Sequence, residues 1–214
     1  MPDWTREELV NKLAGFKAAI TIPVNVLLES KQRILDLSEM QKILKTSKSI
    51  AVSNCSCREK VHACDAPLEV CFSINRRADK LVEKGLARKV TLNQALDTLR
   101  QTHEAGLVHV TLTLTGRDEP EVVCSCCSCC CHSLGGLIRF GMSDALVESK
   151  YMASYNPATC IDCGKCVSRC QFKANWKEEG RIKFDQIRCF GCGVCVSTCP
   201  TNSISLIPRK IANA

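Results

Sequence analysis

A cysteine spacing of eleven residues occurs twice near the C-terminal end, and it constrains this chain more than any other feature. The two copies are Cys160-x2-Cys163-x2-Cys166-x3-Cys170 and Cys189-x2-Cys192-x2-Cys195-x3-Cys199, the second followed by Pro200. Such tight spacing gathers the first three thiols of each copy around one point, and the fourth follows after a helical turn. The repeat favours iron–sulfur ligation over structural zinc and over a disulfide framework.

The segment 151–207 resembles the bacterial two-cluster ferredoxins. The resemblance implies two [4Fe–4S] clusters, each completed by the fourth cysteine of the other copy. The implied ligands are Cys160, Cys163, Cys166 and Cys199 for cluster 1, and Cys189, Cys192, Cys195 and Cys170 for cluster 2. Gln171 departs from the family, which usually has proline after that cysteine. Because proline ligates nothing, we expect the cluster to survive this change. The resemblance therefore implies single-electron transfer to or from redox partner proteins.

Ten of the 18 cysteines lie upstream of this segment, where an ordinary ferredoxin has none. They form two blocks, Cys55, Cys57, Cys64 and Cys71, and then Cys124, Cys126, Cys127, Cys129, Cys130 and Cys131. Three interpretations are open: one or more additional iron–sulfur clusters held jointly by both blocks, structural zinc, or a thiol–disulfide or buried-thiol role. We favour additional clusters, because the cysteines share a chain with the repeated motif and ten thiols are enough for two clusters.

The whole chain also resembles 4Fe-4S binding proteins of anaerobic bacteria and archaea that carry an extra N-terminal cysteine-rich domain. The matching stretches are Asn54-Cys55-Ser56-Cys57-Arg58, Ala105-Gly106-Leu107-Val108-His109 and the segment 123–131. This resemblance implies an architecture and no particular reaction. His132 directly follows the cysteine run, His109 lies in an expected strand, and Arg58 can offset thiolate charge, so these three are candidates for contacts around the ligands.

Charge and composition limit the partners. The formal charge is +7 with neutral cysteines, but a [4Fe–4S] core with four thiolates carries about −2, so two clusters bring the chain to about +3. We therefore expect no nucleic-acid partner. No apolar stretch approaches the roughly 20 residues of a membrane helix, and the polar start is unlike a signal peptide, so we expect a cytoplasmic protein with no membrane span. Phosphate-loop and dinucleotide motifs are absent from the sequence, which argues against bound ATP, flavin or nicotinamide.

The expected fold is mixed, α+β or α/β, with a cysteine-rich α/β domain over residues 1–150 and a ferredoxin domain over 151–214. We expect helices in 1–47, including one opened by Ser38 and Gln41, and a strand at 49–53. An irregular segment at 55–75 and helices at 75–84 and from Thr91 to about Ala105 follow. Strands are expected at 108–114 and 121–123, with a turn at 116–120. A helical segment at 133–150 and a hairpin around 176–182 complete the prediction.

Three functions are compatible with these features. The first is an electron-transfer protein, or an electron-transfer subunit of an anaerobic redox system. The second is an iron–sulfur oxidoreductase whose N-terminal cysteine site is catalytic, acting on a disulfide, a sulfur species or another small molecule. The third is a zinc or thiol redox-sensing module. We favour the first, because the C-terminal repeat accounts for one-electron chemistry directly.

Overall fold

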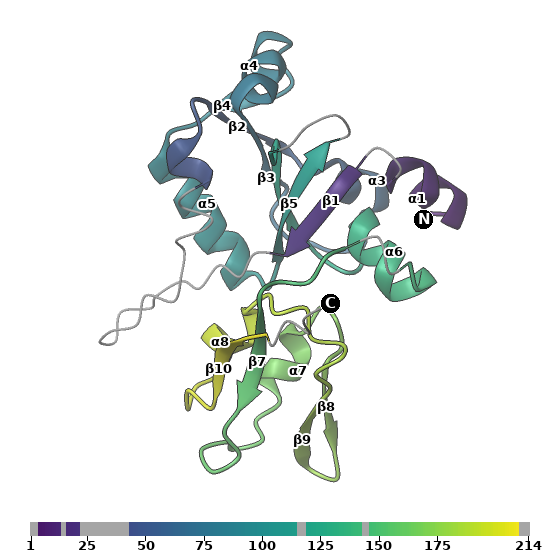
Figure 1. Ribbon diagram of the computed structural model, residues 1–214, viewed down its shortest axis with the longest axis vertical. Coiled ribbons are helices and arrows are strands. Elements are labelled where there is room, and N and C mark those ends of the chain that lie inside the picture. Colours follow the sequence, from purple (N-terminus) through teal and green to yellow (C-terminus); the bar gives the residue numbers. More distant parts are fainter. Residues whose placement is uncertain (1–3, 14–15, 22–42, 115–118, 143–145, 210–214) are drawn as a thin grey trace.

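The computed structural model describes residues 4–13, 16–21, 43–114, 119–142 and 146–209. Its two parts follow one another along the long axis of the molecule (Figure 1). A six-stranded sheet with flanking helices forms the N-terminal part, and a small unit of short helices and two strand pairs forms the C-terminal part. No helix among the described residues is long and apolar enough to cross a membrane.

The N-terminal sheet has the strand order β1-β5-β6-β3-β2-β4, and every neighbouring pair is antiparallel. The strands in that order are β1 (Phe16–Thr21), β5 (Val108–Leu114), β6 (Val122–Cys126), β3 (Glu69–Ile74), β2 (Ile50–Asn54) and β4 (Arg88–Lys89). The mixed helix and strand class expected from the sequence is confirmed. Of its two forms, α+β describes the sheet, since a doubly wound α/β sheet would contain parallel pairs.

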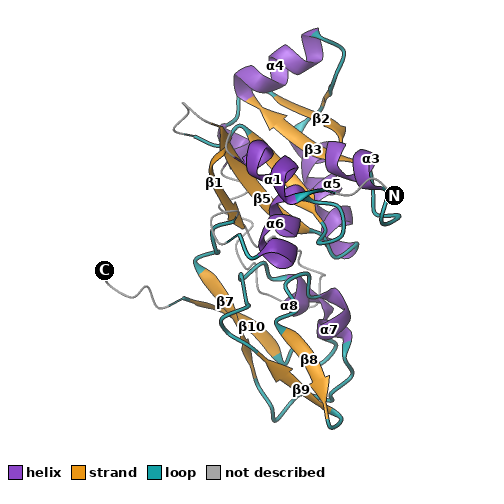
Figure 2. Ribbon diagram, turned by 90° about the vertical axis from the view of Figure 1, so that its right-hand side faces the viewer, coloured by secondary structure: helices purple, strands orange, loops and turns teal. Residues whose placement is uncertain are grey.

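The alternation of side chains along the strands places different residues on the two faces of the sheet. On β5, Val108 and Val110 are buried in one apolar cluster with Cys126, whereas His109 between them contacts the side chains of α5 (Leu92–Glu104). Successive side chains of a strand point to opposite faces, so this division follows directly from the sequence order. One face therefore carries α5, and the other carries the thiols, with α1 (Arg6–Leu13), α3 (Ser56–Val61) and α6 (His132–Phe140) near them (Figures 1 and 2).

Several predicted elements are confirmed where local signals were strong. The helix opened by Thr91 is α5, and both hydrogen bonds of its capping box with Gln94 are present. The helix α4 (Asn75–Glu83) ends before Gly85, whose φ is +67°. The strand predicted at 108–114 is β5, and the hairpin is β8 (Asn175–Glu178) with β9 (Arg181–Phe184).

Other predicted elements are wrong. Residues 16–21 were expected in a helix but form β1, because pairing with β5 outweighs the helical spacing of Phe16 and Ile20. The segment 55–75 is not irregular throughout, since it contains α3 and β3, and β6 extends past Val123 through Cys126. In the described part of the helical segment predicted at 133–150, residues 133–140 are helical and α6 ends at Phe140 before Gly141. The helix opened by Ser38 and most of the turn at 116–120 lie outside the described residues.

In the C-terminal part, β7 (Tyr151–Tyr155) pairs with β10 (Ile204–Pro208), and this pair holds the two ends of the unit together. The short helices α7 (Lys165–Arg169) and α8 (Val194–Thr198) contact each other between the strand pairs. The division of the chain at residue 150 stays a prediction, but β7 begins at the predicted boundary and is bonded only within the C-terminal unit in the described structure.

Candidate iron–sulfur and thiol-rich sites

Both copies of the C-terminal cysteine spacing fold into the same local structure. In each, a glycine with left-handed backbone precedes a five-residue helix, Gly164 with φ 79° before α7 and Gly193 with φ 77° before α8. The third cysteine of each copy lies in the helix and the fourth lies at its C-terminal cap. The pseudo-repeat in sequence is therefore a repeat in structure.

Two cavities lie between the thiols of these copies. One is lined by Cys160, Cys163, Cys166 and Cys199, and the other by Cys170, Cys189, Cys192 and Cys195. Each cavity thus takes three thiols from one copy and the fourth from the other. The second is also walled by apolar side chains, among them Phe172, Phe190 and Val194. All eight cysteines are free thiols, so a [4Fe–4S] cluster fits the donor set of each cavity.

Backbone amides point at several of these sulfurs. The N–H groups of Ala153, Ala174 and Ser203 donate to the Sγ atoms of Cys189, Cys170 and Cys199 at 3.5, 3.2 and 3.3 Å. Amide bonds of this kind stabilise a thiolate over a thiol and tune the potential of a bound cluster. At Cys192 burial outweighs the backbone hydrogen bond from Val194 and raises the pKa of the thiol to about 12, as expected for a thiol in an apolar cavity.

Gly191 in the second cysteine loop supports a first prediction. Its φ is +70°, and an added Cβ would collide with the backbone carbonyl of Tyr151 in β7 and lie 3.1 Å from Cβ of Ser149. We expect Gly191→Ala to displace the loop between Cys189 and Cys192 and to remove about half of the iron and sulfide of the C-terminal unit. Quantitative iron and sulfide analysis of anaerobically purified protein measures this.

Gly164 provides the matched control, because it occupies the first cysteine loop with φ +79° and has nothing within 4 Å of an added Cβ. Gly164→Ala should cost only the roughly 1–2 kcal/mol of a left-handed residue and keep its cluster. Equal iron loss in both variants would show that backbone conformation alone, and not the collision with Tyr151, governs the loop.

Six of the ten upstream thiols form a closed ring on the thiol face of the sheet. Each contacts two others in the order Cys55, Cys57, Cys131, Cys126, Cys124, Cys71 and back to Cys55. Cys124 and Cys126 project to one face of β6 by alternation, and Cys71 on the neighbouring β3 lies 3.6 Å from Cys124 between Sγ atoms. We call these six residues the thiol ring.

Each thiol of the ring controls the ionisation of its neighbours. A hydrogen bond between two neighbouring thiols lowers the pKa of one partner and raises that of the other. The pKa is lowered at Cys55, Cys124 and Cys131 and raised at Cys57, Cys71 and Cys126. The hydrogen bonds of the ring therefore oppose the simultaneous ionisation of all six thiols.

The other four upstream thiols form a second, tighter group. Cys64 follows α3, and Cys127, Cys129 and Cys130 come from the turn after β6. All four Sγ atoms lie within 4.8 Å of one another. We call these residues the four-thiol group. The ten cysteines that the sequence presents as two blocks are thus divided differently in space, because both groups take members from both blocks.

Arg58, predicted as a contact residue, lies between the two groups. Its buried guanidinium donates to the carbonyl oxygens of Pro67 and Ser125 and lies 3.7 Å from Sγ of Cys127. Burial alone would lower the pKa of Arg58, but hydrogen bonding and charge from Cys127, Cys55 and Cys64 raise it. Arg58 therefore stays protonated and offsets thiolate charge on both sides.

His132, another predicted contact residue, has its Nδ1 atom 2.9 Å from Sγ of Cys57 in the thiol ring. Trp4 was not predicted at all. It packs against both thiol groups, its indole N–H donates to the carbonyl of Cys130 at 2.8 Å, and its ring lies edge-on to His132. A contact across 126 positions leaves no local signal, and an isolated tryptophan near the start of a chain is uninformative by itself.

His109 is placed differently from the expectation that it borders the ligands. It lies on the α5 face of the sheet, where Nδ1 is 3.1 Å from the Ser125 hydroxyl and the ring stacks on His103. Burial lowers the pKa of His109 to about 3 and that of His103 to about 4. Both imidazoles are therefore neutral at pH 7 and form part of the buried packing between α5 and the sheet.

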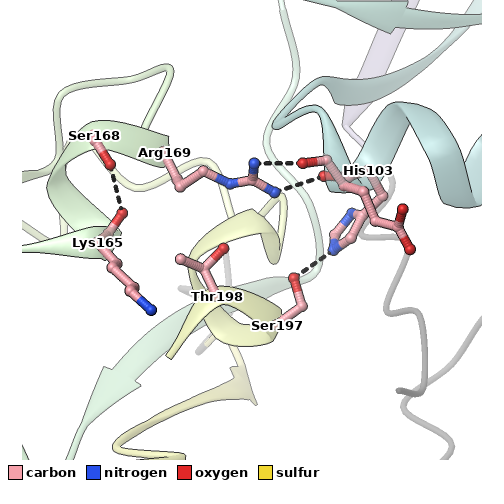
Figure 3. A pocket seen from close by; sticks show the side chains of 7 residues that line it. His103, Lys165, Ser168, Arg169, Ser197 and Thr198 are labelled. Carbon is pink, nitrogen blue, oxygen red and sulfur yellow. Dashed lines mark hydrogen bonds between the residues drawn. The ribbon is translucent and has the colours of Figure 1, made fainter. Parts of the chain in front are cut away.

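The two parts of the chain meet beside these histidines. A cavity of about 350 Å³ there is lined by His103 and Glu104 of α5 and by residues of α7 and α8 (Figure 3). Arg169 donates to the carbonyl oxygens of His103 and Glu104 at the end of α5, and Nε2 of His103 lies 2.7 Å from the hydroxyl of Ser197. Arg169 is therefore engaged in hydrogen bonds within the chain.

Gln171 makes a second link between the two parts. Its Oε1 atom accepts hydrogen bonds from the N–H and the hydroxyl of Ser128, at 2.9 and 2.8 Å, and its Nε2 donates to the carbonyl of Gly106 at 3.0 Å. Ser128 lies between Cys127 and Cys129, and Gln171 directly follows Cys170. The absence of the usual proline marked position 171 in the sequence. The role of Gln171 depends on Ser128, which lies 43 positions away and could not be inferred from the motif.

Comparison with known families agrees with the geometry of the C-terminal part. Residues 160–203 match the family model of the 4Fe-4S dicluster domain. The C-terminal part is therefore a 4Fe-4S dicluster domain, consistent with a ferredoxin-type module, and this supports an iron–sulfur electron-transfer role for the chain. No curated protein matches the chain in sequence.

Proposed function

We propose that this chain is an iron–sulfur electron-transfer protein, or an electron-transfer subunit, whose dicluster domain serves a thiol-rich site in the N-terminal part. Cys160, Cys163, Cys166 and Cys199 would hold cluster 1, and Cys189, Cys192, Cys195 and Cys170 would hold cluster 2. The chemistry that bound [4Fe–4S] clusters supply is the reversible gain and loss of single electrons. The crossed lining of the two cavities supports this assignment.

The observation that carries the proposal is the contact of residues 170–172, at the end of the first cysteine motif, with the N-terminal cysteine segments. Gln171 joins Cys170 to the turn that contains Cys127 and Cys129 through its bonds to Ser128. Independently, Phe172 is buried in one apolar cluster with Cys126 and Cys131 of the thiol ring, and Cys170 and Cys192 pack against the same cluster. A carrier that acted alone would have no need for such continuity between the two thiol-rich parts.

We further propose that the thiol ring holds an additional iron–sulfur cluster. Its six thiols exceed the four ligands of a cubane, and Arg58 stands beside it to offset negative charge. Its members also do not crowd around one point, because no three of them have all their Sγ atoms within 4.8 Å in the described structure. An open ring of this kind suits a core of several irons better than a single ion.

Iron and sulfide analysis with a redox titration followed by electron paramagnetic resonance tests the proposal on the full chain, purified without oxygen. The dicluster domain should supply about eight irons and about eight sulfides, and the thiol ring should raise both totals. Replacing Cys71, Cys124 and Cys126 together by alanine should remove only the excess, because the three ring thiols that remain are too few to ligate a cubane. Totals that stop at the dicluster complement would refute the additional cluster, and absence of iron from the dicluster domain would refute the whole proposal.

The contact between His132 and Cys57 favours a second candidate, an oxidoreductase whose thiol ring is catalytic. Nδ1 of His132 lies 2.9 Å from the Cys57 thiol, so an imidazole that can exchange a proton lies beside a thiol that a four-ligand cubane does not need. Spectral change on adding small thiols, disulfides or sulfide to the oxidised protein would favour catalysis. If the spectrum does not change with thiols, disulfides or sulfide, electron transfer remains the proposed function.

A further inference from the structure

The sulfurs of the four-thiol group lie at the spacing of a single tetrahedral ion. Sγ of Cys64 is 3.7 Å from that of Cys127 and 3.9 Å from that of Cys130, and Cys129 and Cys130 are 3.8 Å apart. Four sulfurs at about 2.3 Å from one central ion in tetrahedral geometry lie about 3.75 Å from one another. These three distances match the edges of such a tetrahedron, and the other three sulfur–sulfur distances are at most 4.8 Å.

We propose that Cys64, Cys127, Cys129 and Cys130 bind one divalent thiophilic ion, Zn²⁺ or Fe²⁺, in a mononuclear site separate from every cluster of the chain. Four thiols give up four protons as the ion binds, and the resulting complex carries a charge of about −2. A tetrahedral set of four sulfurs is the donor arrangement that these two ions share.

The other cysteines of the same chain serve as internal references. In the dicluster domain a cavity separates the thiols of each set, as a cubane core requires. Neither of those sets, nor the thiol ring, brings three Sγ atoms within 4.8 Å of one another among the described residues, whereas the four-thiol group brings all four. The spacing of this group leaves no room for several irons and bridging sulfides between the thiols.

Two backbone amides and one buried cation contact the four-thiol group and can offset thiolate charge. The N–H of Ala66 donates to Cys64 and that of Ala63 donates to Cys130. The protonated Arg58 lies 3.7 Å from Sγ of Cys127. Amide donors and a buried cation are the contacts that offset the charge of a four-thiolate complex.

A disulfide does not account for the arrangement. All four cysteines are free, and their closest sulfurs are 3.7 Å apart, far beyond the ~2.05 Å of a disulfide bond. Cys129 and Cys130 are adjacent in sequence, and Cys127 and Cys64 both approach the same point from other directions. A tetrahedral ion requires four sulfurs that converge on one point, whereas a disulfide requires only two.

X-ray absorption of the wild-type full chain, purified anaerobically, is the first test. In the zinc case, about one zinc per chain should show four sulfur neighbours at about 2.3 Å and no nearby metal. In the iron case, zinc should be absent, and the oxidised protein should show the resonance of mononuclear high-spin iron in addition to the cluster signals. Absence of both signatures would overturn the proposal without recourse to any variant.

Cys64→Ala and Cys129→Ala form the second test, with Cys71→Ala in the thiol ring as the matched control. The zinc content, or in the iron case the signal of mononuclear iron, should fall roughly tenfold or more in Cys64→Ala and Cys129→Ala. Sulfide should stay unchanged in both variants, and the ion should persist in Cys71→Ala. Loss of sulfide with several irons in Cys129→Ala would indicate a cluster, and an ion that persists in both ligand variants would be adventitious. Either result overturns the proposal, yet neither alters the dicluster signals on which the proposed function depends.

Discussion

Cysteine pairs removed together from the dicluster domain should show that its ligands cross between the two copies of the motif. Cys160→Ala combined with Cys199→Ala should leave one cluster, because both residues line the same cavity. Cys189→Ala combined with Cys199→Ala should leave none, because these residues line different cavities. Residues that act in one unit are not additive, whereas residues of separate units are.

The size of this effect makes the measurement decisive. Each cluster lost removes about four irons and about four sulfides, so the two double variants should differ by one whole cluster in chemical analysis and in the integrated signal of the reduced protein. If each copy of the motif held its own cluster, the order of the two variants would be reversed. Single substitutions of Cys160 and Cys199 should each match their double variant, and they control for general loss of stability.

The elements predicted correctly are those whose signals are local. Thr91 and Gln94 are three positions apart, and the capping box between them fixes the start of α5 without help from the rest of the chain. The left-handed Gly85 likewise ends α4 by its own conformation. Elements decided by distant partners could not be predicted this way, and β1 shows this, because its pairing with residues 110–114 determines its conformation.

The same distinction separates the two kinds of site. Spacing within eleven residues is enough to define the dicluster motif, because the thiols of one copy converge through local turns. The division of the ten upstream cysteines depends on the antiparallel register of β3 with β6, which sets Cys71 beside Cys124, and on the path that brings Cys64 to Cys127 across 63 positions. Alternation in Cys124-x-Cys126 predicts a shared face for those two thiols, but not which other thiols meet them.

Gln171→Pro should keep both clusters of the dicluster domain while disconnecting it from the four-thiol group. Cys170 has φ −78° and ψ 101°, nearly the conformation of Cys199, φ −75° and ψ 113°, which precedes Pro200. That extended conformation is the one a following proline requires, so the backbone can accept the change. The variant removes the bonds from Gln171 to Ser128 and Gly106.

Loss of these bonds should have two measurable consequences. The free energy of unfolding of the junction should fall by about 1–3 kcal/mol, because the partly buried Ser128 N–H and Gly106 carbonyl lose their partner. After rapid photoreduction of the dicluster domain, electrons should reach the cluster proposed in the thiol ring severalfold more slowly. The reason is that the variant breaks the connection that runs from Cys170 through the Gln171 side chain to Ser128. Iron and sulfide should stay at the wild-type level.

Two further variants separate connection from stability. Lys173→Ala changes an exposed neighbour in the same loop and should leave both the stability and the transfer rate unchanged. Gln171→Ala combined with Ser128→Ala should be no slower than Gln171→Ala alone, since both changes break the same bond. A Gln171→Pro protein that is less stable but transfers electrons at the wild-type rate would limit Gln171 to holding the two parts together, and the apolar contact of Phe172 with Cys126 and Cys131 would then be the connection that matters.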